Sequence, residues 1–409
     1  MTLKARKKSA YHLYLACSLI QSMLFYLVFS IEYVYMLNTI HLNAFQMVIV
    51  GVVLQFFCVI FEIPTGIVAD SYSRKYSIII GFIMTGIGFL IEGFMPNFIF
   101  LLIAQAIWGI GSTFISGSLQ AWIVDEEKDI NLDKVFLRGS QYEQIGAVIG
   151  IILSIAIGNI KEHLPIVISG FLFIVFALYL IITMPELNFI GTKPKYKEAL
   201  QESFYSFYKG LIIIRKEKVL SIFLGIAVAW GLASEGYDRL WTSHLLSNFN
   251  NKQTNFLNDV TLVGTLELIS MFVSVFLIEY LIRKVETDAL HMRAILFIVN
   301  FLNIGMIALF ALSDNVYLLA VLHVFIFTLR SANQPTLSSN INKDIPQEIR
   351  ATAISVYNQM DNIGQIVGGL IVAFIAGKYS VSIGILITIV FLLPALLLIF
   401  KLTRCKVEK

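Results

Sequence analysis

Long apolar runs, parted by short polar breaks, recur through the whole length of this chain. The run GFLFIVFALYLIITM at 170–184 is apolar on every face, unlike an amphipathic surface helix or the alternating strand of a membrane barrel. Of the 409 residues, 57% are hydrophobic and 14% are charged, so one water-soluble core cannot hide the apolar surface. The sequence therefore predicts an all-α integral membrane protein.

Twelve of these runs are long enough to cross a bilayer, which takes about 20 apolar residues. The predicted spans are 11–37, 45–65, 76–94, 98–123, 140–160, 164–184, 219–246, 258–281, 291–312, 316–338, 351–375 and 379–401. The basic start of the chain leads into the first span without a small-residue cleavage site, so we expect this span to remain as a membrane helix.

The basic residues gather at alternate ends of the predicted spans. If the N-terminus lies in the cytoplasm, the cytoplasmic segments hold 25 of the 30 lysines and arginines, and the extracellular segments hold Lys161, Lys252 and Lys378. Because Lys and Arg accumulate in cytoplasmic loops, we expect a multi-pass protein of the cell membrane with both termini in the cytoplasm.

The longest polar interval divides the spans six and six. We predict an N-terminal half at 1–184, a cytoplasmic central loop at 185–218 and a C-terminal half at 219–409. The loop is basic and contains several aromatic residues, which is typical of segments that contact anionic lipid headgroups. It gives no reason to expect nucleic-acid binding.

The two halves share a stretch that repeats at an offset of 218 residues. QYEQIGAVIG at 141–150 aligns without a gap with QMDNIGQIVG at 359–368, which pairs Glu143 with Asp361. Repeated six-helix halves are typical of transporters. The repeated glycines form small-xxx-small faces that let helices pack closely. Chance similarity between two glycine-containing helices is the alternative.

A charged stretch interrupts the apolar pattern between the second and third spans. GIVADSYSRK at 66–75 holds a glycine, an aspartate four residues later and then a basic pair. It resembles the signature loop of the major facilitator superfamily. That resemblance implies a major facilitator fold of two six-helix halves, in which Gly66, Asp70, Arg74 and Lys75 form a conformational latch.

Two readings of this signature remain open. In the first, the residues form a latch: Gly66 lets the second helix pack tightly, and Asp70 caps a helix terminus or pairs with a cation there. In the second, Arg74 and Lys75 only orient the chain in the membrane. The offset of 218 also pairs Asp70 with Asp288 and Lys75 with Arg293, which form a degenerate copy of the signature in the second half.

Two further motifs resemble the bacterial drug-exporter branches of the superfamily. They are FEIPTG at 61–66 and GSLQAWIVDEE at 117–127. Two features differ from the proton-antiport exporters: Gln105 replaces their arginine four residues before Gly109, and the fifth span has no proline. The resemblance implies efflux of a small amphipathic compound such as an antibiotic, with proton coupling. An uptake symporter of the same fold is the alternative, and the direction of accumulation separates the two.

Several ionisable side chains fall inside predicted spans, where a charge costs about 3 kcal/mol and indicates a function or a partner. They are Glu32, Glu143, Glu235, Asp238, Arg239, Glu267, Arg330 and Asp361. Glu235 and Arg239, one helical turn apart, form either a structural ion pair or part of a substrate site, and Asp238 then has no local partner. Three other carboxylates, Glu62, Glu92 and Glu279, lie near span ends, where we expect them to snorkel.

Depth decides which carboxylate carries the coupling proton. Asp361 lies eleven residues past Arg350, about 16 Å along a helix, whereas Glu143 lies five residues past Arg138. A carboxylate that is removed from water takes up a proton more readily. We therefore predict Asp361 as the coupling residue, with Glu32 as the second candidate.

The sequence predicts no cofactor, no metal site and no enzymatic activity. It has no GxxxxGK[ST] phosphate loop, and its three cysteines are widely separated. One reading from another class is an integral-membrane transferase that uses the acidic run DEEKD at 125–129 to hold metal and a diphosphate, although a second acidic motif is missing. Magnesium-dependent turnover of a prenyl diphosphate would reveal it. We expect a monomer that contacts a small-molecule substrate, a proton or other coupling ion, and membrane lipid.

Overall fold

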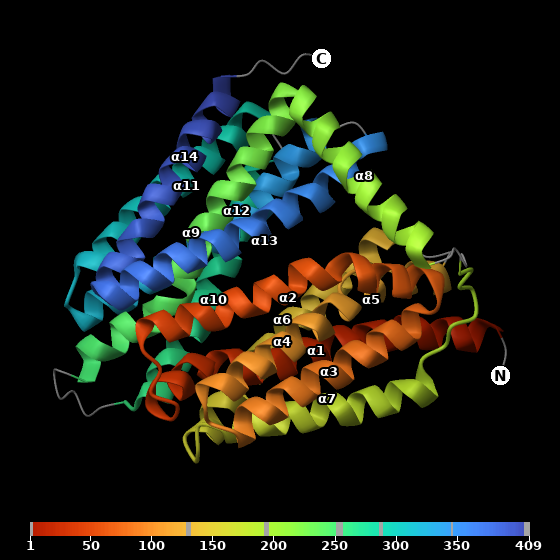
Figure 1. The fold of residues 1–409 in the computed structure, drawn as a ribbon, viewed down its shortest axis with the longest axis horizontal. Coiled ribbons are helices and arrows are strands. Elements are labelled where there is room, and N and C mark those ends of the chain that lie inside the picture. Colours follow the sequence, from red (N-terminus) through yellow and green to blue (C-terminus); the bar gives the residue numbers. More distant parts are fainter. Residues whose placement is uncertain are drawn as a thin grey trace. The chain divides into compact units, whose positions relative to one another are not determined.

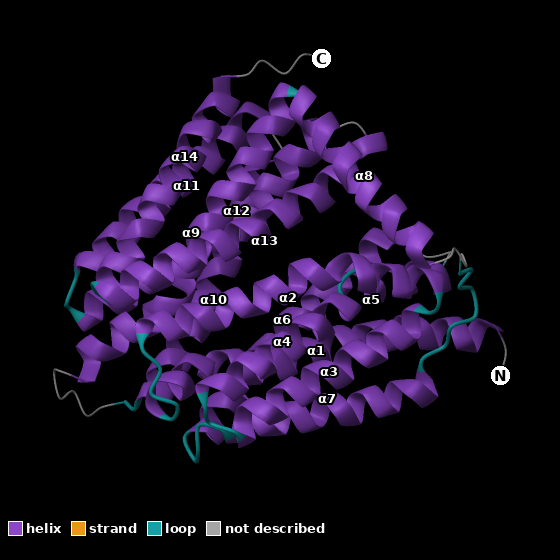
Figure 2. Cartoon of the chain, in the orientation of Figure 1, coloured by secondary structure: helices purple, strands orange, loops and turns teal. Residues whose placement is uncertain are grey.

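The computed structural model describes residues 3–127, 132–191, 196–250, 257–285, 289–344 and 347–404, and the regular structure in these ranges is helical (Figure 2). The helices are α1 (Leu3–Asn38), α2 (Ala44–Ser71), α3 (Arg74–Phe94), α4 (Phe98–Ile115), α5 (Ser118–Glu126), α6 (Leu132–Gly158), α7 (Leu164–Thr183), α8 (Tyr196–Lys216), α9 (Lys218–Asn250), α10 (Asp259–Val285), α11 (Ala289–Leu312), α12 (Val316–Asp344), α13 (Gln347–Lys378) and α14 (Val381–Arg404). Asp288, the expected copy of Asp70, lies outside the described residues.

The predicted all-α architecture and its twelve spans are confirmed. Among the described residues, twelve helical stretches are long and apolar enough to cross a membrane, from Ala10–Asn38 to Val381–Thr403. Each overlaps one predicted span. The hydropathy of the chain thus locates its membrane helices.

The second span extends further than its apolar run. Helix α2 continues to Ser71, so Gly66 and Asp70 lie in its last turns and not in a loop. The connection to α3 is short because Ser73 is the N-cap of α3, with its Oγ accepting a hydrogen bond from the Tyr76 amide at 3.0 Å. The expectation that Gly66 packs tightly finds no support: apart from its chain neighbours and the backbone of its own helix, no described atom lies within 4 Å of the Cβ that another residue would add there.

The fourth span, which hydropathy predicts as one helix, is divided into two. Helix α4 ends at Ile115, and α5 begins at Ser118 after Gly117, whose φ of 69° lies in the left-handed region. A glycine adopts this conformation without the steric cost that a Cβ imposes. The break redirects α5, the helix that carries Trp122 and Asp125.

The polar interval 185–218, predicted as a loop, contains the helix α8. Its apolar residues recur at helical spacing at Leu200, Phe204 and Leu211, but charged residues among them lower its hydropathy below that of a membrane span. A search for membrane helices therefore passes over it.

The described chain forms two compact units. One unit comprises 1–41 and 56–204, and the other comprises 42–55 and 205–409, so the first part of α2 belongs with the C-terminal helices. Within the first unit, α3 packs on α4 and α7, and within the second, α9 packs on α13 and α14 (Figure 1). The division of the chain at 184 and 219 stays a prediction.

The repeated glycines pack equivalent helices in the two units. A Cβ at Gly146 would lie 3.0 Å from the backbone nitrogen of Met23, which places α6 against α1. A Cβ at Gly364 would lie 2.8 Å from the carbonyl oxygen of Val228, which places α13 against α9. The prediction that these glycines serve close packing is confirmed.

Candidate functional site

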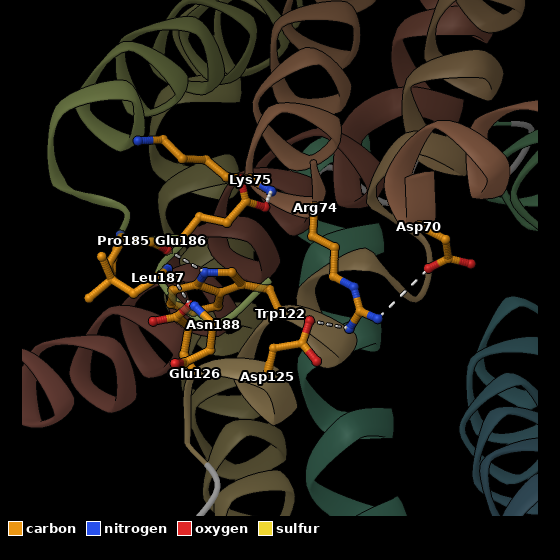
Figure 3. A network of polar contacts seen from close by, with 10 residues as sticks. All are labelled: Asp70, Arg74, Lys75, Trp122, Asp125, Glu126, Pro185, Glu186, Leu187 and Asn188. Carbon is orange, nitrogen blue, oxygen red and sulfur yellow. Dashed lines mark hydrogen bonds and ion pairs between the residues drawn. The ribbon is translucent and has the colours of Figure 1, made fainter. Parts of the chain in front are cut away.

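The signature residues lie in a polar network at one end of the first unit (Figure 3). The Arg74 guanidinium points between two carboxylates, 3.0 Å from Asp125 of α5 and 3.8 Å from Asp70 of α2. The Asp70 side chain is 71% exposed, whereas that of Asp125 is 27% exposed. Asp70 therefore pairs with Arg74, as expected, but Asp125 is the closer and less exposed partner.

A carboxylate from the other end of this half completes the start of α3. Glu186 accepts hydrogen bonds from the Ser73 hydroxyl at 2.6 Å and from the Lys75 amide at 2.9 Å (Figure 3). An acidic side chain at a helix N-terminus satisfies free amides and interacts favourably with the helix dipole. Sequence reasoning missed Glu186 because more than 100 residues separate it from the signature.

The residues 185–188, here called the strap, are fastened to α5. The Trp122 indole donates to the Pro185 carbonyl oxygen at 2.7 Å, and Glu126 accepts from the Leu187 and Asn188 amides at 2.7 and 3.0 Å. Figure 3 shows the strap lying between Trp122 and Glu126. The strap and the signature are thus parts of one network.

This network also bears on the transferase reading. Asp125 binds Arg74, and Glu126 binds backbone amides of the strap, so two carboxylates of the acidic run are engaged by the protein itself. Glu127 is buried, and the last two residues of the run, 128–129, lie outside the described residues. The structure gives the transferase reading no support.

The degenerate copy of the signature in the second unit shares one contact with the first, a cation bound to a backbone carbonyl oxygen. In the first unit, the Lys75 ammonium donates to the carbonyl oxygen of Ile181 at the end of α7. In the second unit, the Arg293 guanidinium donates to the carbonyl oxygen of Leu402 at the end of α14. Both cations precede the apolar part of the third helix in their half and meet the end of the sixth, which fits the negative C-terminal end of a helix.

Buried polar residues meet where α1, α3 and α4 approach one another. The Gln105 amide nitrogen lies 3.0 Å from a Glu32 oxygen and 3.4 Å from a Glu92 oxygen. Glu32 is 2% exposed and Glu92 is 1% exposed. The expectation that Glu92 snorkels is therefore wrong, because Gln105 and the Tyr35 hydroxyl, which donates to the Glu92 carbonyl, hold it inside.

The second unit contains the larger group of charged residues. Glu235 and Arg239 form a buried ion pair at 3.0 Å on α9. The first part of α2 packs directly on this pair, since a Cβ at Gly51 would lie 2.7 Å from the Arg239 guanidinium carbon. The structure thus favours the structural ion pair among the two readings that the sequence left open.

Asp238 has a partner that its neighbours in the sequence do not reveal. Its carboxylate accepts a hydrogen bond at 2.7 Å from Arg330 of α12, so the expectation of an Asp238 without a local partner is corrected. The Arg330 guanidinium also lies 5.6 Å from the ring centroids of Trp230 and Tyr237. Two aromatic rings and one carboxylate therefore hold this cation.

Asp361 lies near the same charges but is bound differently. Its carboxylate accepts a hydrogen bond from Gln365 at 2.8 Å, and it has no ion pair within the described chain. The charges of Glu235, Asp238 and Arg330 reach it. We call Glu235, Asp238, Arg239, Arg330 and Asp361 the charge cluster.

The charge cluster has one carboxylate more than it has guanidinium groups. With all five residues ionised, three negative charges face two positive charges, and the two ion pairs leave Asp361 as the surplus. A surplus charge away from water is costly unless a proton or a cation neutralises it. The cluster can therefore bind and release one positive charge.

The two remaining predicted carboxylates lie outside this cluster. Glu143, the repeat partner of Asp361, is exposed and belongs to the first unit, where the Ser18 hydroxyl lies 3.4 Å from it. On α10, the Oε2 atom of Glu267 is buried and has no hydrogen-bond partner among the described residues. The greater burial of Asp361 relative to Glu143 agrees with the predicted order of depth.

Comparison with known proteins gives one consistent result. Residues 14–369 match the family model described as Major Facilitator Superfamily. The Bacillus subtilis protein "Uncharacterized MFS-type transporter YxaM" is 23% identical over 365 residues, which cover 86% of each chain.

Solved structures of the same fold include two transporters at 16% identity. The nucleoside transporter NupG superposes with a TM-score of 0.78 over 99% of this chain and 100% of its own. A bacterial homologue of the human lysosomal transporter Spinster superposes with a TM-score of 0.72 over 98% and 97% of the two chains. At this identity the two structures show the fold alone.

Proposed function

Because this chain belongs to the major facilitator superfamily and is thus a membrane transporter, we propose that it is a secondary active transporter that exports a small amphipathic compound in exchange for protons. Transporters of this architecture expose a central site alternately to the two sides of the membrane. An ion gradient drives the cycle when the same site binds the ion and responds to the solute.

The surplus carboxylate of the charge cluster carries this proposal. Asp361 is bound by an amide, and the Arg330 guanidinium that acts on it is already paired with Asp238. Protonation of Asp361 balances the cluster, and loss of that proton restores the surplus charge. In this proposal Asp361 is the coupling residue, and Glu32, Glu143 and Glu267 are further positions on the proton or solute pathway.

The aromatic rings beside the charges support an amphipathic solute. Trp230 and Tyr237 flank Arg330, and the Asp238 side chain is 46% exposed. A solute with a charged group and an apolar ring system finds complementary groups at such a site. Glu235 and Arg239 neutralise each other and frame the site.

Export is the proposed direction because of the motifs at 61–66 and 117–127. A susceptibility panel across drug classes tests it with cells that express the wild type, the Asp361→Asn variant or no protein. We expect the wild type to raise the tolerated concentration of at least one amphipathic compound, and the variant not to. Equal growth in all three strains, with proton-driven accumulation of a solute inside wild-type cells, would indicate the uptake symporter instead.

Orientation in the membrane follows in this proposal from the basic residues, which place both termini and α8 in the cytoplasm. Cysteines that replace Lys209 on α8 and Lys378 at the end of α13, both exposed, provide the test. An impermeant maleimide is expected to label Lys378→Cys in intact cells and Lys209→Cys only after the membrane is opened. Labelling of both from the same side would overturn the topology.

A further inference from the structure

Arg330 acts on two carboxylates of the charge cluster but is bound to only one of them. It pairs with Asp238 at 2.7 Å, and its charge also reaches Asp361. Both carboxylates are half-buried, and the Asp238 side chain is 46% exposed. How strongly Arg330 acts on Asp361 depends on the distance between the two charges, and therefore on what restrains the guanidinium beside Asp238.

The two rings that flank Arg330 provide this restraint. Trp230 and Tyr237 both lie on α9, and each ring centroid is 5.6 Å from the guanidinium carbon. This separation is within the range of cation–π attraction. The position of the cation therefore depends on the position of the rings.

Each ring is itself held by a buried polar residue of another helix. The Trp230 indole donates to Asn300 of α11 at 2.9 Å, and the Asn300 amide donates in turn to Asn333 of α12, also at 2.9 Å. The Tyr237 hydroxyl lies 3.0 Å from Nδ1 of His323 of α12. All of these side chains are buried.

The buried ring of His323 leaves one of its nitrogen atoms without a hydrogen bond in the described chain. Its ring stacks on Trp241 with 3.8 Å between centroids, and its Nε2 atom has no hydrogen-bond partner among the described residues. A buried polar atom without a hydrogen bond destabilises the fold, because it has lost its bonds to water. A phenylalanine would stack equally well without this cost, so the contribution of the histidine lies in its bond to Tyr237.

We propose that His323 and Asn300 are positioning residues for proton coupling: they fix Tyr237 and Trp230 so that Arg330 stays on Asp238 and leaves Asp361 to bind the proton. This inference rests on the proposed coupling role of Asp361. His323 and Asn300 do not bind Asp361 themselves. They affect it through the position of the Arg330 guanidinium.

The expected effect follows from the charges around Asp361. Within the described chain these are Glu235 and Asp238 of α9 and Arg330 of α12. Tyr357 on its own helix contributes a neutral phenol, and α14, which also packs on α13, adds no charge there. Release of Arg330 brings a positive charge closer to Asp361. A close positive charge favours the ionised carboxylate, so protonation then requires a lower pH.

Labelling with dicyclohexylcarbodiimide, which modifies protonated carboxyl groups in apolar surroundings, tests this without a known substrate. The full-length protein is labelled across a pH series, and modification of Asp361 is quantified by mass spectrometry. We expect the pH of half-maximal labelling to fall by about one unit in His323→Phe and in Asn300→Leu. The control His244→Phe alters a buried histidine that contacts the carbonyl oxygens of Phe310 and Ser313, and it is expected to change nothing.

A double-variant cycle separates positioning from a general structural effect. Arg330→Gln removes the cation and is expected to raise the pH of half-maximal labelling of Asp361. Adding His323→Phe to Arg330→Gln should then have no further effect on this pH. The positioning role would be overturned if His323→Phe and Asn300→Leu left the pH of half-maximal labelling unchanged. It would also be overturned if His323→Phe lowered this pH by the same amount in the Arg330→Gln background. If the wild type shows no pH-dependent labelling of Asp361, the coupling role itself fails, which distinguishes the two proposals.

Discussion

Asp361→Asn is expected to abolish solute accumulation driven by a pH gradient while it preserves solute binding. The asparagine keeps the shape of the side chain and its contact with Gln365, but it cannot gain or lose a proton. The charge cluster is then permanently balanced, so substrate binding no longer depends on a proton. Proteoliposomes measure the two properties separately, because exchange of labelled for unlabelled substrate requires binding and movement but no gradient.

Glu143→Gln is the matched control for this prediction. The repeat places Glu143 at the equivalent position of the other half, but its side chain is exposed, so we expect only partial impairment. If Asp361→Asn still accumulates substrate against a gradient in response to a pH difference, the coupling role belongs to another residue. Glu32, buried beside Gln105, is then the next candidate.

Arg74→Ala and Asp70→Asn are expected to reduce transport severely without loss of membrane insertion. In the proposed latch, Arg74 holds Asp70 of α2 and Asp125 of α5 to the start of α3. Exposed ion pairs contribute less than about 1 kcal/mol to stability, so the loss of the Asp70 pair leaves the fold intact. A large effect on transport then has to come from the change between conformations.

Transport rates, normalised to the amount of protein in the membrane, measure this effect. Glu217→Gln removes an exposed carboxylate of the second unit and is expected to behave as the wild type. Full activity in both Arg74→Ala and Asp70→Asn would limit the basic pair to its role in orienting the chain. A loss of inserted protein in both would instead make the pair structural.

Hydropathy predicted the membrane helices because it is a property of consecutive residues. The same reasoning placed Glu235 next to Arg239, since a helix brings residues four apart onto one face. It could not find the partner of Asp238, because Arg330 lies 92 residues away on another helix. It also missed the break at Gly117, where a single glycine within an apolar run gives little warning of a left-handed turn.

The charged contacts of the signature were predictable only in part. The repeat and the resemblance pointed to Asp70, Arg74 and Lys75, but neither pointed to Glu186 or Glu126. Both carboxylates bind backbone amides, and such bonds leave no complementary side chain in the sequence to search for. The prediction of Gly66 as a packing residue found no support for the opposite reason, because the family pattern suggested a contact that the described chain does not show.

The strap determines where this polypeptide can be cut into two separately produced fragments. A cut at Met184, where the sixth span ends by hydropathy, would place Glu186 and the backbone amides that Glu126 binds on the wrong fragment. The N-terminal fragment would then lack the carboxylate that binds the Ser73 hydroxyl and the Lys75 amide at the start of α3. A cut after Gly191, whose added Cβ would lie 2.6 Å from the Ser71 carbonyl oxygen, retains every one of these bonds. Split-protein reporters and co-expressed halves of this transporter should therefore be joined or separated beyond that glycine.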